Sequence, residues 1–217
     1  MIILTKNNSI KTNFFYLSIL ILFSFFINYY YAKLGSFPID TFLHYDSSYR
    51  ILNGEFPIKD FWIASGLIVD ILQSFFFKIL GVNWFAYIVH ASLFNCLFTI
   101  LIYLFFLKNK INNFKAFLLS ISFSILSYTI SGTPFVDLHA TYFLLIATLL
   151  IINNLNTNKN YLWFIITILL FLSFLSKQVP ATYATFFYFF ILSYYFINKI
   201  EFKIIKIIIF SSFLLLI

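Results

Sequence analysis

The chain is poor in charged residues and has almost no cysteine. Asp, Glu, Lys and Arg make up 10% of its 217 residues, whereas hydrophobic residues make up 62%. A soluble domain of this length has too little interior to hide that much apolar surface, so the composition excludes one. The single cysteine, Cys96, lies within an apolar run. One cysteine excludes a disulfide framework within the chain and a cysteine-type metal cluster.

Acidic residues are also scarce, and the formal net charge is +7. A basic chain can bind nucleic acid, but most of these lysines stand in short segments between apolar runs, which is typical of membrane topology. We therefore expect no nucleic-acid partner. The 33 Phe residues are most simply side chains that face lipid.

Apolar runs of about twenty residues predict an all-α, polytopic transmembrane helix bundle. Residues 1–13 are a cytoplasmic tail, 14–31 a retained first span, and 32–83 a long outer loop. Further predicted spans are residues 84–107, 116–131, 136–152, 161–176 and 179–197. A seventh, 207–217, is incomplete, because it is about 16 Å long against a hydrocarbon core of about 30 Å. We expect residues 1–217 to be one transmembrane domain, truncated at its C-terminus.

The segment 61–80 decides the orientation of every later span. It is long enough to cross, but its polar residues fall on one helical stripe, which predicts a helix lying along the membrane interface. Nine lysines then face inward and five basic residues outward, whereas a crossing would turn seven of the nine outward, against the positive-inside rule. The N-terminus is therefore predicted to be cytoplasmic. The stripe comprises Gly66, Asp70, Gln73, Ser74 and Lys78.

Six of the seven acidic residues fall on the predicted outer side, four of them within residues 38–60. A membrane protein needs no outer acids merely to fold, so this bias predicts a site that performs chemistry there. The six are Asp40, Asp46, Glu55, Asp60, Asp70 and Asp137, and only Glu201 falls inward.

Two short motifs supply candidate catalytic groups. Asp46, in His44-Tyr45-Asp46, could accept a proton from a hydroxyl nucleophile, or it could simply cap a short helix over 47–52. Asp137, in Asp137-Leu138-His139, begins the fourth span, where the helix macrodipole alone would favour an acid. Together these acids and histidines are weak candidates for a divalent metal site, and we expect no cofactor.

Lys177-Gln178 interrupts an apolar stretch between the fifth and sixth spans. Lys177 could snorkel to the interface or bind a lipid phosphate at headgroup depth. Arg50 could do the same, with a fork geometry better suited to phosphate. His90 and Asn95, on the second span, are expected to make buried hydrogen bonds between helices.

The run from Asp46 to Trp62 reads DSSYRILNGEFPIKDFW, and Ser65-Gly66 and residues 77–81 (FKILG) follow it. This sequence resembles the first outer loop of GT-C membrane glycosyltransferases, in their protein-mannosyltransferase-like and aminoarabinose-transferase-like branch. The resemblance covers roughly residues 14–197, with its specific part at 46–81. Such enzymes have a cytoplasmic N-terminus, one span, a long outer loop with interfacial helices, and then many spans.

The resemblance implies a polyprenyl-phosphate sugar donor, an acceptor glycan, lipid or protein outside the cytoplasm, and Asp46 as general base. Members often have a second acid after it, where this chain has Ser47. Outer cations would stabilise the phosphate leaving group. We expect a location in a bacterial inner membrane. The candidate substrate-binding residues are Arg50, Asp60, Asp137, His139, Lys177 and Gln178.

Two other functions are compatible with the sequence. A transporter or flippase for a lipid-linked glycan would need a polar path through the membrane, and charges within the spans are nearly absent. A non-catalytic membrane scaffold is favoured if the outer acids do not converge. If the chain is a glycosyltransferase, we expect Asp46, Asp137 and Lys177 to open onto one outer cleft.

Overall fold

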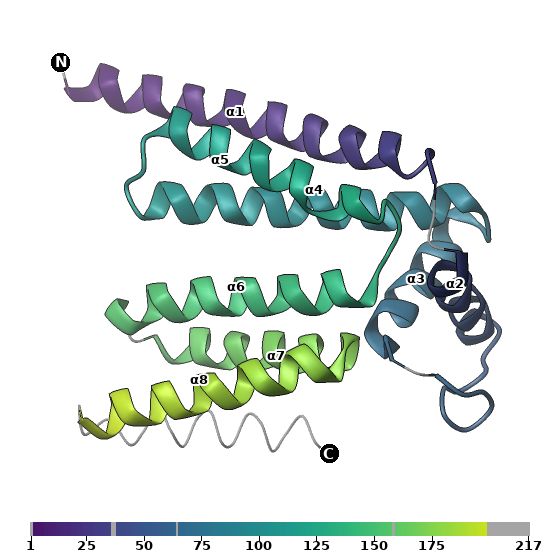
Figure 1. Ribbon diagram of the computed structural model, residues 1–217. Coiled ribbons are helices and arrows are strands. Elements are labelled where there is room, and N and C mark those ends of the chain that lie inside the picture. Colours follow the sequence, from purple (N-terminus) through teal and green to yellow (C-terminus); the bar gives the residue numbers. More distant parts are fainter. Residues whose placement is uncertain (1, 36–37, 64, 158, 199–217) are drawn as a thin grey trace. The chain divides into compact units, whose positions relative to one another are not determined.

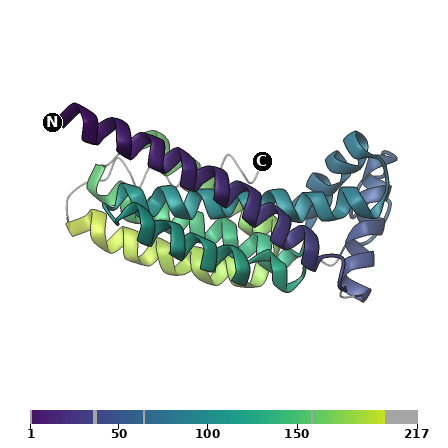
Figure 2. The same cartoon turned by 90° about the horizontal axis from the view of Figure 1, so that it is seen from above.

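The computed structural model describes residues 2–35, 38–63, 65–157 and 159–198, and there every regular element is a helix (Figures 1 and 2). The predicted all-α class is confirmed. The α-helices are α1 (Ile2–Tyr31), α2 (Pro38–Leu52), α3 (Leu67–Leu80), α4 (Trp84–Lys108), α5 (Asn113–Leu126), α6 (Val136–Thr157), α7 (Asn160–Ser176) and α8 (Gln178–Asn198), and a 3-10 helix, η1 (Tyr128–Ile130), follows α5.

Four of the described helices are long and apolar enough to cross a membrane, so the chain is a multi-pass membrane protein. The apolar α7 is about 25 Å long, shorter than a hydrocarbon core of about 30 Å. Crossing by α7 and α8 stays a prediction, and the predicted span 207–217 lies outside the described residues. The four candidate spans are Thr12–Tyr31, Trp84–Lys108, Asn113–Ile130 and Val136–Leu155.

The chain divides into two compact units. The first unit comprises Met1–Glu55 and Leu72–Phe135, and the second comprises Phe56–Ile71 and Val136–Ile217. The first unit therefore contains α1, α2, α4, α5 and most of α3. The second contains the loop before α3, the start of α3, and α6 to α8.

In the first unit, α1 and α4 are antiparallel. Asn28 of α1 donates from Nδ2 to Ser92 Oγ of α4 at 3.0 Å. Farther from the α2 end, the Tyr103 hydroxyl of α4 donates to Asn13 Oδ1 of α1 at 3.3 Å. Residues 32–83 therefore leave α1 and return to α4 at the same end of this helix pair (Figure 1).

Buried polar side chains join the helices of the first unit. Asn95 Nδ2 of α4 donates to the Ser24 carbonyl of α1 at 2.8 Å and to the Ser124 carbonyl of α5 at 3.2 Å. His90 Nδ1 lies 2.9 Å from Gln73 Oε1 of α3. Such hydrogen bonds hold helices together where lipid removes the hydrophobic drive between them. The predicted interhelical role of His90 and Asn95 is confirmed.

The predicted third span, 116–131, is interrupted near its end. Asn112 caps the start of α5 by accepting the Phe114 N–H at 2.9 Å, and α5 stops at Leu126, before η1. Gly132 then turns the chain with φ +69°. Its carbonyl accepts from Asn28 Nδ2 at 3.2 Å, so this turn packs directly on the end of α1.

The predicted helix over 61–80 is shorter in the structure, because α3 begins at Leu67. Gly66 has φ +88°, a left-handed conformation that ends the preceding loop, and its carbonyl accepts the Asp70 N–H at 2.9 Å. At the other end of α3, Gly81 again has positive φ, and its N–H donates to the Phe77 carbonyl at 2.9 Å. Glycines therefore set both ends of α3.

A helix that lies on a membrane surface turns its polar stripe toward water. In α3, part of the polar stripe is buried instead. Asp70 and Gln73 of the stripe are buried, whereas Ile71, Phe75 and Ile79 are exposed. Lys78 of the stripe is exposed, so only part of the stripe is buried. The exposed apolar side chains suit a helix with a free face that meets lipid. The position of α3 at a membrane interface stays a prediction.

The second unit consists mainly of α6, α7 and α8. Ser173 Oγ of α7 donates to the Ala140 carbonyl of α6 at 2.8 Å, and Asn154 Oδ1 accepts the Lys159 N–H at 2.9 Å across the turn between them. These contacts make α6 and α7 antiparallel. The apolar core comprises Ala147, Ile151, Trp163, Ile166 and Leu192.

Candidate functional site

Asp46 lies inside α2, not at its start. The alternative prediction, that Asp46 caps a short helix over 47–52, is wrong because α2 begins at Pro38. Proline is favoured at a first helical position, and Asp40 in the first turn suits the positive end of the helix dipole. These residues start the helix earlier and leave the Asp46 carboxylate without a capping role.

Asp46, Arg50 and Glu55 form a charged cluster on the free side of α2. Arg50 Nε is 2.8 Å from Asp46 Oδ2, and Arg50 Nη1 is 3.2 Å from Glu55 Oε2. Hydrogen bonding to Asp46, with the charge of that carboxylate and the same two effects from Glu55, raises the pKa of Arg50 above its ordinary value. The Asp46 side chain is 61% exposed, so it stays open to a second partner.

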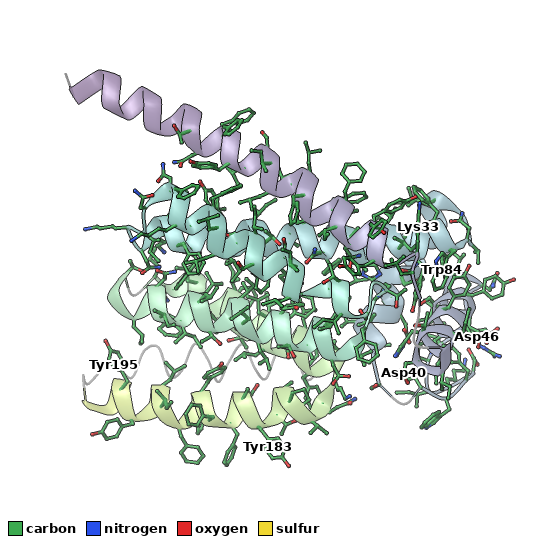
Figure 3. All side chains as sticks on the ribbon, turned by 45° about the horizontal axis from the view of Figure 1, so that its top comes forward. Lys33, Asp40, Asp46, Trp84, Tyr183 and Tyr195 are labelled. Carbon is green, nitrogen blue, oxygen red and sulfur yellow. The ribbon has the colours of Figure 1, made fainter. Side chains whose placement is uncertain are left out.

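This cluster lies at the end of the first unit where α1 stops and α4 starts. Figure 3 shows Asp40 and Asp46 on α2 at the same end as Lys33 and Trp84. Tyr45, which directly precedes Asp46, packs against Phe77 and Tyr87 at distances between ring centres of 4.8 and 5.3 Å. Burial raises the pKa of the Tyr45 phenol above its ordinary value. These ring contacts pack α2 against α3 and α4.

The histidine of each short motif is separated from its acid. His44 is buried while Asp46 is exposed, and His139 is buried while Asp137 is part-exposed. Two residues apart on a helix means about 200° of rotation, so the two side chains point to different faces. Within the described residues, no three His, Cys, Asp or Glu side chains are grouped to hold a metal ion.

Asp60 closes a loop of the second unit. Its Oδ2 accepts the Phe56 N–H at 2.7 Å, and its own N–H donates to the Phe56 carbonyl at 2.8 Å. The carboxylate thus has a structural partner, and its predicted contact with substrate stays untested.

Asp137 and Lys177 form an ion pair in the second unit. Lys177 Nζ is 2.7 Å from Asp137 Oδ1, and the two side chains are 35% and 42% exposed. Asp137 lies in the first turn of α6, as predicted. Lys177 stands where α7 ends, directly before the exposed Gln178 that begins α8. The sequence analysis expected these two residues at one cleft, but it did not predict their direct ion pair.

The 40-residue separation of Asp137 and Lys177 recurs in two contacts between α6 and α8. Tyr188 of α8 hydrogen-bonds Thr148 of α6 at 2.5 Å, and the Tyr195 hydroxyl of α8 donates to the Leu155 carbonyl at 3.4 Å. Both pairs have the same separation as Asp137 and Lys177. Steps of eleven and seven residues stay on one helical stripe, so α6 and α8 lie parallel with a constant register.

The structure thus joins the predicted site residues in two groups. Asp46 and Arg50 belong to the first unit, and Asp137 and Lys177 belong to the second. A single cleft shared by the two groups stays a prediction. Comparison of the chain with family models, with curated proteins and with solved structures gave no match.

Proposed function

We propose that the chain belongs to a membrane glycosyltransferase that moves a sugar from a polyprenyl-phosphate donor to an acceptor on the non-cytoplasmic face. The observation that carries the proposal is the Asp46 carboxylate. It lies in mid-helix with no capping role, it is exposed, and Arg50 holds it at 2.8 Å. A fixed, accessible carboxylate in the first loop is what a hydroxyl acceptor needs as its general base.

Arg50 has a defined task in this proposal. Its guanidinium bridges Asp46 and Glu55, which orients the Asp46 carboxylate and leaves the cluster with a net charge of −1. The acceptor hydroxyl then approaches the exposed carboxylate, gives up its proton to it, and attacks the sugar carbon as the donor phosphate leaves.

Lys177 would meet the donor phosphate at the turn between α7 and α8. In the structure Asp137 holds the Lys177 ammonium at 2.7 Å, so an incoming phosphate would compete with Asp137 for this cation. A lysine near a leaving phosphate stabilises the charge that develops in the transition state. In this proposal Asp137 keeps Lys177 in place until the donor arrives.

The test is a transfer assay on the purified protein, reconstituted in vesicles with radiolabelled polyprenyl-phosphate sugars. Asp46→Asn keeps the shape but removes the proton acceptor, and loss of a general base typically lowers the rate about 10²- to 10⁴-fold. Asp40→Asn is the matched control, because Asp40 is an exposed acid on the same helix. Equal rates for the two variants would contradict the proposal.

A non-catalytic scaffold is the second candidate, and one observation favours it. Asp46, Glu55 and Asp137 each have a basic partner within their own unit, as charges with a purely structural role do. If the protein is a scaffold, Asp46→Asn should lower the stability of α2, and the parent protein should show no sugar transfer.

A further inference from the structure

Residues Phe56–Trp62, here named the wedge loop, form a closed and rigid turn in the second unit. The Phe56 N–H donates to Asp60 Oδ2 at 2.7 Å, and the Asp60 N–H donates back to the Phe56 carbonyl at 2.8 Å. The Ile58 N–H donates to the Phe61 carbonyl at 2.8 Å. The backbone of the loop is therefore fixed by its own hydrogen bonds.

The wedge loop presents large apolar side chains outward. Ile58 is 80% exposed, Trp62 77% and Phe56 66%. Ile58 also has φ +73°, a left-handed conformation that is strained for a β-branched residue. In water this loop would gain nothing from holding an isoleucine on a strained backbone. The arrangement becomes favourable when the exposed side chains enter an apolar phase.

Lysines beside the exposed aromatic side chains indicate that the apolar phase is a lipid membrane. Lys59 Nζ lies 5.8 Å from the centre of the Phe56 ring, so a cation accompanies the exposed aromatic groups. Lys33 Nζ stands 4.1 Å from the Tyr29 ring in the same way at the end of α1, a candidate span. Lysine with tryptophan or tyrosine is the combination found where proteins meet lipid headgroups.

The wedge loop belongs to the segment of the chain that connects two candidate spans. Its segment, 32–83, starts and ends at one end of the α1–α4 pair, and both helices are candidate spans. Only residues 53–55 separate the loop from α2. We propose that the wedge loop inserts Ile58 and Trp62 into the boundary between lipid headgroups and acyl chains, with Lys59 among the lipid phosphates. This inference does not rest on the proposed function.

The experiment measures Trp62 fluorescence in the full chain, reconstituted in vesicles of phosphatidylcholine and phosphatidylglycerol. The chain has three tryptophans, so the signal of Trp62 is the difference between the parent and Trp62→Phe. Lipids brominated near the headgroup should quench this difference signal strongly, whereas aqueous acrylamide should quench it weakly. Ile58→Asn should reduce the lipid quenching about two-fold, because asparagine accepts positive φ but does not enter lipid.

Ile39→Asn is the matched control, because Ile39 is an equally exposed isoleucine on α2, outside the loop. It should leave the Trp62 signal unchanged. Quenching of Trp62 by acrylamide but not by brominated lipid would place the loop in water and overturn the proposal. Protection from both quenchers would mean that protein covers the loop, and unchanged lipid quenching in Ile58→Asn would show that Ile58 does not insert. Either result also overturns it.

Discussion

At the scale of single residues, neighbours in the sequence have opposite environments. His44 and Asp46 look like one motif in the sequence, but α2 buries the histidine and exposes the acid. Asp46 then pairs with Arg50, four residues on, as helical geometry favours. The sequence contains the i,i+4 spacing of this pair. The spacing indicates an ion pair only if both residues lie inside one helix. The predicted cap at Asp46 started that helix at residue 47, so Asp46 fell outside it.

Gly132 is the residue whose size the first unit tolerates least. A Cβ at this position would lie 2.6 Å from Ala32 Cα, a backbone atom that cannot move aside cheaply, and φ is +69°. We predict that Gly132→Ala destabilises the protein by more than the roughly 1–3 kcal/mol of a strained backbone conformation alone. Unfolding in detergent, followed by circular dichroism, measures the change.

Gly54→Ala is the control for that prediction. Gly54 also has positive φ, at +88°, but a Cβ added there would meet no atom within 4 Å. Gly54→Ala should lower the free energy of unfolding only by the cost of positive φ, because it creates no steric overlap. Equal stability of the two variants would contradict a close approach of Gly132 to the Ala32 backbone.

At the scale of elements, the apolar runs predicted most helices, but their polar faces were harder to interpret. Asn95 and His90 were expected between helices, and they are there, because a polar group within a span has few other partners. The stripe on α3 predicts an interfacial helix, and this position stays a prediction, while the structure buries Asp70 and Gln73 of the stripe. Periodicity shows that a helix has two faces, and it does not show which face meets protein.

The register of α6 against α8 gives a prediction at this scale. Positions 144 and 184 share the 40-residue offset of the observed contacts, and both are half-buried. In a Cys96→Ser background, the pair Leu144→Cys and Ala184→Cys should be joined efficiently by a short bifunctional maleimide. The cross-link would be detected by gel mobility after proteolysis between the helices.

The control pairs Leu144→Cys with Phe186→Cys. Phe186 is 64% exposed, and two residues along a helix turn its side chain to another face. Tyr183, also on the exposed side of α8, points away from the helices of its unit (Figure 3). Equally efficient cross-linking of both pairs would contradict the register.

At the scale of the whole molecule, composition was sufficient to predict a multi-pass helical membrane protein. Charge predicted more, namely which loops face the cytoplasm, because lysines near spans are retained on that side. The antiparallel α1–α4 pair returns residues 32–83 to the end from which they leave. A cleft shared by Asp46 and Lys177 stays a prediction, because the two residues belong to different units and no local pattern links residues so far apart in the sequence.

Orientation in the membrane is the last prediction. With the N-terminus in the cytoplasm, the exposed turn at Asn53 should face outward and the exposed turn at Lys110 should face inward. Single cysteines at these positions, in the Cys96→Ser background, would be treated with a membrane-impermeant maleimide. Asn53→Cys should react in intact cells, and Lys110→Cys only in inverted vesicles. The reverse pattern would place the Asp46 cluster in the cytoplasm, where the lipid-linked donor and outer acceptor of the proposed reaction could not meet it.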